Sequence, residues 1–233
     1  MTSIIEQAFK AYDETLSNLE LAFSALPTSS TFWNKFEGKV KDAANALGLL
    51  GWYFDMKLPP NTLFLLHQAI TEGNQSFVDD ALSQYFEKHF SRIERNIVRK
   101  FPNRKKIIKS AFRAHGRKEY ELSIPVLFAQ TDGICLELFG KQLFLKNGKD
   151  PQTAVYVRQM VTNTFLQAIL QPISIDLPIS WNKEKRKSED YAGLNRHEVL
   201  HGESTCYGTK ENSLKAISLI NFIACQKDFI KTP

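Results

Sequence analysis

The sequence predicts a mainly α-helical protein that folds as a single compact unit. Apolar residues recur at intervals of three and four along most of the 233 residues, which places them on one face of amphipathic helices. Prolines and helix-capping residues separate these stretches at ordinary helix lengths. The composition, with 43% hydrophobic and 24% charged residues, is that of a soluble globular chain. We expect an N-terminal helical region over 1–100 and a C-terminal helical region over 101–233, either distinct or continuous as one domain.

Four helical stretches are expected in the N-terminal region. The first covers 5–23, where charged residues lie among apolar ones at helical spacing. The second runs over 32–50 after a Ser or Thr cap, and the third lies around 63–71 after two prolines. The fourth covers 76–100, has helical spacing throughout and ends before Pro102.

The C-terminal region continues the helical pattern. A helix is expected over 104–115, and the apolar run after Pro125 is expected to be helical, with a short strand as the alternative. The pair Asp150-Pro151 is typical of a helix start, which predicts a helix over 150–171. A long connection that carries two more prolines follows. Two helices are then expected at 194–201, ended by Gly202, and from 209 toward 226.

The positive charge of the chain is local. From Arg92 to Lys118 there are eleven Lys or Arg and one acid, so this segment carries +10 while the whole chain carries +5. Such clustering is typical of a surface that binds RNA or another polyanion, and an acidic protein partner is the alternative. The expected contact residues are a ridge at four-residue spacing, its neighbour Arg104, and a cluster in the long connection: Lys105, Lys109, Arg113, Arg117, Lys185 and Arg186.

The sharpest candidate for chemistry is the run Arg196-His197-Glu198-Val199-Leu200-His201. A histidine that titrates near neutrality can take the proton of a ribose 2′-hydroxyl or give one to the leaving oxygen. An arginine beside it stabilises the added negative charge of the transition state. This chemistry on an RNA phosphodiester requires no metal. The alternative is structural, with the same side chains hydrogen-bonded to the ends of neighbouring helices.

This run resembles the Arg-polar-x-x-x-His motif of the HEPN superfamily of helical proteins. Many members are metal-independent endoribonucleases of toxin–antitoxin, abortive-infection and other defence systems. The resemblance implies a HEPN-like helical bundle in the C-terminal region, with Arg196 and His201 as the catalytic pair. His197 occupies the polar position, where Asn is commoner. It also implies a homodimer in which two motifs face one cleft.

Two other functions are consistent with the sequence. A non-enzymatic immunity protein or antitoxin would cover the active site of a toxin partner with its charged surface. The string HEVLH also fits the H-E-x-x-H pattern, with His197 and His201 as zinc ligands, Glu198 as the base and Glu211 as the only plausible third ligand. Since Gly202 is expected to end the helix directly after His201, we disfavour zinc and expect neither a metal nor a cofactor.

The remaining composition bears on the cellular setting. Three scattered cysteines do not form a disulfide framework. The N-terminal stretch carries charges within its apolar residues, unlike a signal peptide, and we find no run of about 18 apolar residues. We expect a cytoplasmic protein without a membrane partner.

Overall fold

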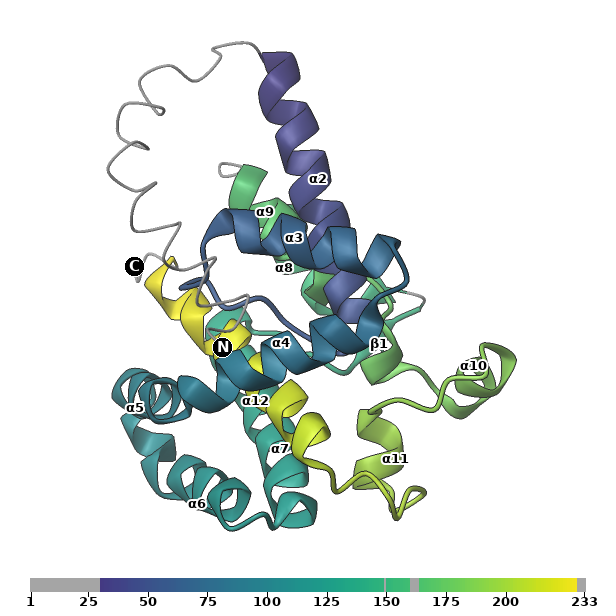
Figure 1. The fold of residues 1–233 in the computed structure, drawn as a ribbon. Coiled ribbons are helices and arrows are strands. Elements are labelled where there is room, and N and C mark those ends of the chain that lie inside the picture. Colours follow the sequence, from purple (N-terminus) through teal and green to yellow (C-terminus); the bar gives the residue numbers. More distant parts are fainter. Residues whose placement is uncertain (1–29, 149, 160–163, 230–233) are drawn as a thin grey trace, which may run out of the picture.

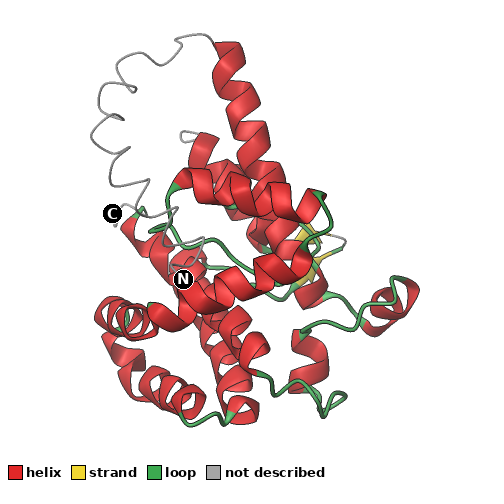
Figure 2. Ribbon diagram, viewed as in Figure 1, coloured by secondary structure: helices red, strands yellow, loops and turns green. Residues whose placement is uncertain are grey.

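The computed structural model describes residues 30–148, 150–159 and 164–229. The helix expected over 5–23 lies outside the described residues. The rest is mainly α-helical, as the sequence predicts (Figures 1 and 2). One layer contains α2, α3, α8 and α9, another contains α5, α6 and α7, and α4 and α12 lie between them (Figure 1). Both layers belong to one continuous hydrophobic core, so the two expected regions are interleaved within one body.

The N-terminal helices lie close to their expected positions. Helix α2 spans Ser30–Leu49, α3 spans Pro60–Thr71 with proline at its start, and α4 spans Gln75–Lys88. The expected helix over 76–100 is divided, because α5 begins anew at Phe90 and ends at Lys100. The junction residue His89 has φ −98° and ψ 6°, which departs from helical geometry and bends the chain.

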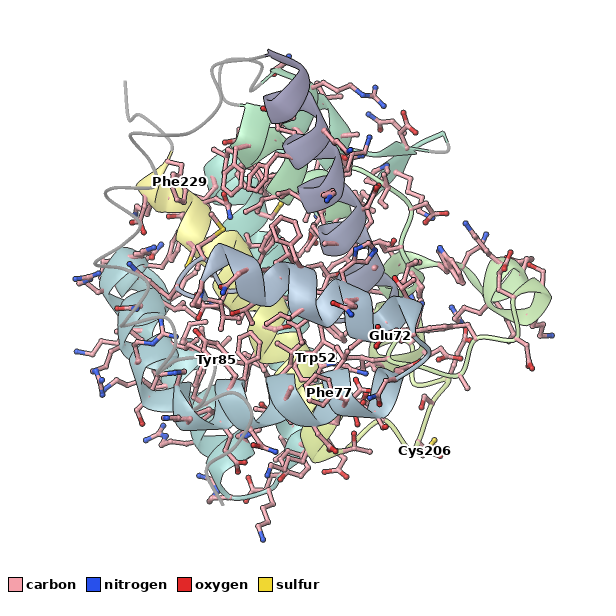
Figure 3. All side chains as sticks on the ribbon, turned by 45° about the horizontal axis from the view of Figure 1, so that its top comes forward. Trp52, Glu72, Phe77, Tyr85, Cys206 and Phe229 are labelled. Carbon is pink, nitrogen blue, oxygen red and sulfur yellow. The ribbon has the colours of Figure 1, made fainter. Side chains whose placement is uncertain are left out.

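A buried carboxylate holds the bend in place. Asp55, in the loop between α2 and α3, is fully buried and accepts hydrogen bonds from the Tyr85 hydroxyl at 2.9 Å and Arg92 Nη2 at 2.7 Å. Tyr85 lies before the bend and Arg92 after it, so one acid joins both helices. Figure 3 shows Trp52 and Tyr85 inside the body, where the Trp52 Nε1 donates to Asp79 at 2.7 Å.

Helices α6 and α7 form an antiparallel pair. Helix α6 spans Lys105–Gly116 after the short 3-10 turn η1 (Pro102–Arg104), and α7 spans Tyr120–Phe139. The apolar run around Pro125 is therefore helical, the first of its two expected forms. Proline has no N–H to donate to the carbonyl four residues earlier, that of Glu121. The Tyr207 hydroxyl donates to this carbonyl at 3.0 Å and satisfies it.

The expected helix over 150–171 is wrong at its start. Asp150–Pro151 forms strand β2, which pairs antiparallel with β1 (Lys146–Asn147). Gly148, with φ +65°, follows Asn147, and Asn-Gly is a strong hairpin signal. Helix α8 begins only at Thr153 and ends at Gln159, and α9 covers Thr164–Ile169.

The last third of the chain returns to the centre of the fold. The long connection contains η2 (Gln171–Ile173), η3 (Pro178–Ser180) and α10 (Lys183–Ser188). Helix α11 covers Arg196–Leu200, within the expected 194–201. Helix α12 (Lys210–Cys225), followed by η4 (Gln226–Asp228), confirms the expected final helix. Every residue of α12 from Ser213 to Ala224 is buried, so it is the core helix.

Among the described residues, α7 is the one helix long and apolar enough to cross a membrane by length and composition. It packs against α6 on one side and α12 on another (Figure 1). Its apolar residues therefore serve largely as core, as those of a central helix in a helical bundle do.

Candidate nucleic-acid interface and histidine site

The local fold holds α11 firmly in place. Asn195, 1% exposed, caps the helix by accepting hydrogen bonds from the backbone N–H groups of His197 at 2.8 Å and Glu198 at 3.2 Å. Its Nδ2 donates to the carbonyls of Pro178 at 2.6 Å and Trp181 at 3.0 Å. The start of the motif is thereby joined to η3 and to the residue that follows it.

Arg186 belongs to this scaffold. Its side chain is 5% exposed, and it forms ion pairs with Glu203 at 3.0 Å and Glu198 at 3.3 Å. Its Nη1 also donates to Asn195 Oδ1 at 3.2 Å. Lys185 pairs with Asp176 at 3.0 Å. Neither residue joins an exposed basic patch with the expected ridge, because α10 directs Arg186 inward and an acid holds Lys185.

The two histidines of the motif lie against each other. Their rings are nearly parallel, at 9°, and their centroids are 5.8 Å apart. His201, which caps the end of α11, is exposed, and His197 is half-buried. Burial lowers the pKa of His197, and the positive charge of Arg196 lowers it further. His197 is consequently neutral at physiological pH, the form that accepts a proton.

Arg196 points in a different direction. Its guanidinium lies 5.5 Å from the centre of the Phe144 ring, just after α7. Its Nε is buried and has no hydrogen-bond partner in the described part of the chain. Residues five apart on a helix are about 140° apart around its axis. Within one chain, α11 therefore aims Arg196 and His201 at different surroundings.

The two carboxylates that a zinc site at HEVLH would use are engaged in ion pairs with basic side chains. Glu198 is paired with Arg186, and the Glu211 carboxylate is paired with Lys215 at 2.7 Å. Among the described residues, no group of three His, Cys, Asp or Glu side chains is placed to hold a metal ion. The HEVLH string thus lacks a third ligand in the part of the chain that the structure describes.

The basic segment divides into structural and exposed residues. Four of its eleven cations are held by acids, in the pairs Arg92–Asp55, Lys100–Asp228, Arg104–Glu137 and Arg117–Glu119. The others are exposed and form no ion pair with any described residue: Arg95, Arg99, Lys105, Lys106, Lys109, Arg113 and Lys118. We call these seven residues the α5–α6 basic surface. In Figure 3, nitrogen-tipped side chains project outward from this side of the molecule.

Arg104, expected to contact RNA beside the ridge, lies across α7 instead. Its guanidinium donates to the Gly133 carbonyl at 3.0 Å and to Gln130 Oε1 at 3.1 Å. A Cβ at Gly133 would come within 2.7 Å of this guanidinium, so the glycine makes room for the arginine. Arg104 thereby joins η1, directly before α6, to α7 and is unavailable to a ligand in this arrangement.

The basic surface contains a groove that the ridge alone does not predict. It has a volume of about 390 Å³ and is lined by Arg95 and Arg99 from α5 and by Lys105 and Lys109 from α6. Sequence reasoning counted the two arginines in the charge but did not place them at the site. Their spacing of four residues, on the side opposite buried Ile97, was the available signal.

Phe101, within the basic segment, belongs to the core, and Tyr120, just after the segment, packs against it. Phe101 is fully buried. Tyr120 is half-buried with its ring against His115, at a centroid distance of 5.3 Å. His115 is itself buried and its Nδ1 lies 2.8 Å from Ser213 Oγ, as expected for a core histidine. Neither aromatic is placed to stack on a base.

The basic surface and the α11 motif do not form one site. Helices α5 and α6 lie on one side of the α7–α12 pair and α11 lies on the other (Figure 1). No protein-family model, curated protein or solved structure matches the chain. The case for function therefore depends on the geometry of these two places.

Proposed function

We propose that this protein binds RNA and that the α5–α6 basic surface holds the phosphate backbone. The observation that carries the proposal is a set of seven exposed cations on α5, on α6 and in the turn after α6, without ion pairs to described residues. Elsewhere in the segment, acids neutralise the cations that the fold uses. Unpaired cations at this density repel one another, and a polyanion relieves that repulsion while releasing its counterions.

The spacing of the surface also supports a polyanion. Lys105, Lys109 and Arg113 follow one another at four-residue steps, which advance about 6 Å along a helix axis. Successive phosphates of a nucleic-acid strand have a similar separation. Since no aromatic residue of the segment is exposed for stacking, binding is expected to depend on the backbone and not on the base sequence.

Fluorescence anisotropy with a labelled RNA tests this proposal. The double variant Lys109→Gln/Arg113→Gln should bind about tenfold more weakly than the unmodified protein. The matched control, Lys39→Gln/Lys41→Gln, removes the same charge from exposed positions of α2 and should bind normally. Equal losses in both variants, or no RNA binding at low salt, would contradict the proposal and favour the alternative partner, an acidic protein such as a toxin.

A second candidate is metal-independent RNA cleavage at the HEPN-like motif. It is favoured by the neutral His197 beside the exposed His201. RNA incubated with the protein in EDTA should be cleaved, and Arg196→Ala and His201→Ala should abolish cleavage while leaving the circular dichroism spectrum intact. Because the motif and the basic surface lie on different sides of one chain, this candidate function places the RNA at the cleft between the two facing motifs of the homodimer that the resemblance implies.

A further inference from the structure

The groove in the α5–α6 basic surface is charged on both walls. Arg95 and Arg99 stand on the α5 wall, one helical turn apart, and Lys105 and Lys109 stand one turn apart on the α6 wall. Glu94 is the one acid among the lining residues, so the groove carries a net charge of +3. Half-buried Val98 lies between the charged residues of α5 and contributes an apolar surface.

Two facing rows of cations fit the backbone of a single RNA strand better than the two backbones of a duplex. A single strand that lies between the walls brings each phosphate within reach of a cation from either helix. A duplex is too wide to enter a groove of about 390 Å³ and would rest on the outward-facing residues. An A-form duplex also presents its phosphates in two rows along the edges of its grooves, and only one row could meet the walls.

We propose that the α5–α6 groove holds a single RNA strand by its phosphates, in preference to a duplex and without reading the base sequence. This inference rests on the RNA binding proposed above. Among the described residues that line the groove there is no aromatic side chain, so base stacking does not contribute and the cations contact phosphates, which are the same for every base. The apolar surface of Val98 contacts the sugars, which are the same for every base.

Competition between single and double strands tests this inference on the full chain. A labelled, unstructured uridine-rich oligonucleotide and a duplex of equal length are titrated at the same salt concentration. We expect the single strand to bind at least about tenfold more tightly. The groove variant Arg99→Gln/Lys105→Gln should weaken single-strand binding about tenfold and leave duplex binding nearly unchanged.

A second pair outside the groove provides the matched control. Lys106→Gln/Lys118→Gln removes two exposed charges that do not line the groove, and it should affect duplex binding more than single-strand binding. If the duplex binds as tightly as the single strand, or if the groove variant leaves single-strand binding unchanged, the groove is not the strand site although RNA binding stands. If neither nucleic acid binds, the proposed function itself fails.

Discussion

Raising the salt concentration should weaken RNA binding, and the steepness of this effect should report how many groove cations contact phosphates. Each phosphate neutralised on a single strand contributes about −0.7 to the slope of log K against log salt. The four groove cations, Arg95, Arg99, Lys105 and Lys109, therefore predict a slope of about −2.8. An increase from about 50 to about 200 mM salt should then reduce affinity about 50-fold.

Neutralising half of the groove should halve this dependence. The variant Arg99→Gln/Lys105→Gln retains two groove cations, so its slope should be about −1.4 and the same salt increase should reduce its affinity only about sevenfold. Both side chains are exposed and form no ion pair with described residues, so the fold should tolerate the change. Anisotropy titrations at several salt concentrations measure the slope directly.

Two outcomes of these titrations would contradict phosphate binding by the groove cations. A wild-type slope near zero would show that phosphate neutralisation is not the source of affinity. Equal slopes for the two proteins would show that Arg99 and Lys105 do not meet phosphates, even if the variant binds more weakly. The control Lys39→Gln/Lys41→Gln should keep the wild-type slope, because its charges lie on α2.

Three further predictions concern the scaffold. Burial lowers the pKa of His115 to about 4, below its ordinary value of about 6.5. Between these two pH values the unfolded chain therefore binds more protons than the folded chain. The free energy of unfolding should fall by up to about 3 kcal/mol as pH drops through that window. His115→Gln should flatten this part of the pH profile in urea denaturation, and an unchanged profile would contradict the assignment. Arg186→Met should lower the free energy of unfolding by about 2–3 kcal/mol. The loss is less than for a fully buried pair, because its partner Glu198 reaches solvent. A thermal melt equal to that of the unmodified protein would show that the ion pairs of Arg186 with Glu198 and Glu203 are dispensable for stability. Asp55→Asn should cost about 3 kcal/mol, since it leaves the guanidinium of Arg92 without its buried partner, and chemical denaturation that detects less than about 1 kcal/mol would refute that role.

Local signals predicted the helices that have clear ends. Prolines before α3 and after α5, a threonine cap before α12 and a glycine after α11 each act on the backbone within a few residues, so the sequence alone places these ends well. The break at His89 coincides with a long-range contact. It allows Arg92 to reach Asp55, 37 residues earlier, and no pattern within the helix encodes that contact. The hairpin at 146–151 did have a local signal, Asn147-Gly148, which the stronger reading of Asp150-Pro151 as a helix start obscured.

The candidate site was predictable in charge but not in arrangement. Net charge and four-residue spacing identify the segment 92–118 as basic. They do not reveal which cations form ion pairs within the fold, because the acids that pair with Arg92, Lys100 and Arg104 come from distant parts of the chain. Spacing likewise placed Arg196 beside two histidines without showing that the guanidinium faces Phe144.

The position of α12 along the chain has a consequence for synthesis. This core helix is translated after α4, α5 and α7, against which it packs, and about 70 residues separate Phe139, the end of α7, from its start at Lys210. At about 5–20 residues per second, several seconds of synthesis separate the end of α7 from the start of α12, the helix that covers the apolar faces of α4, α5 and α7. Until α12 has been made, these apolar faces lack the helix that buries them in the finished fold.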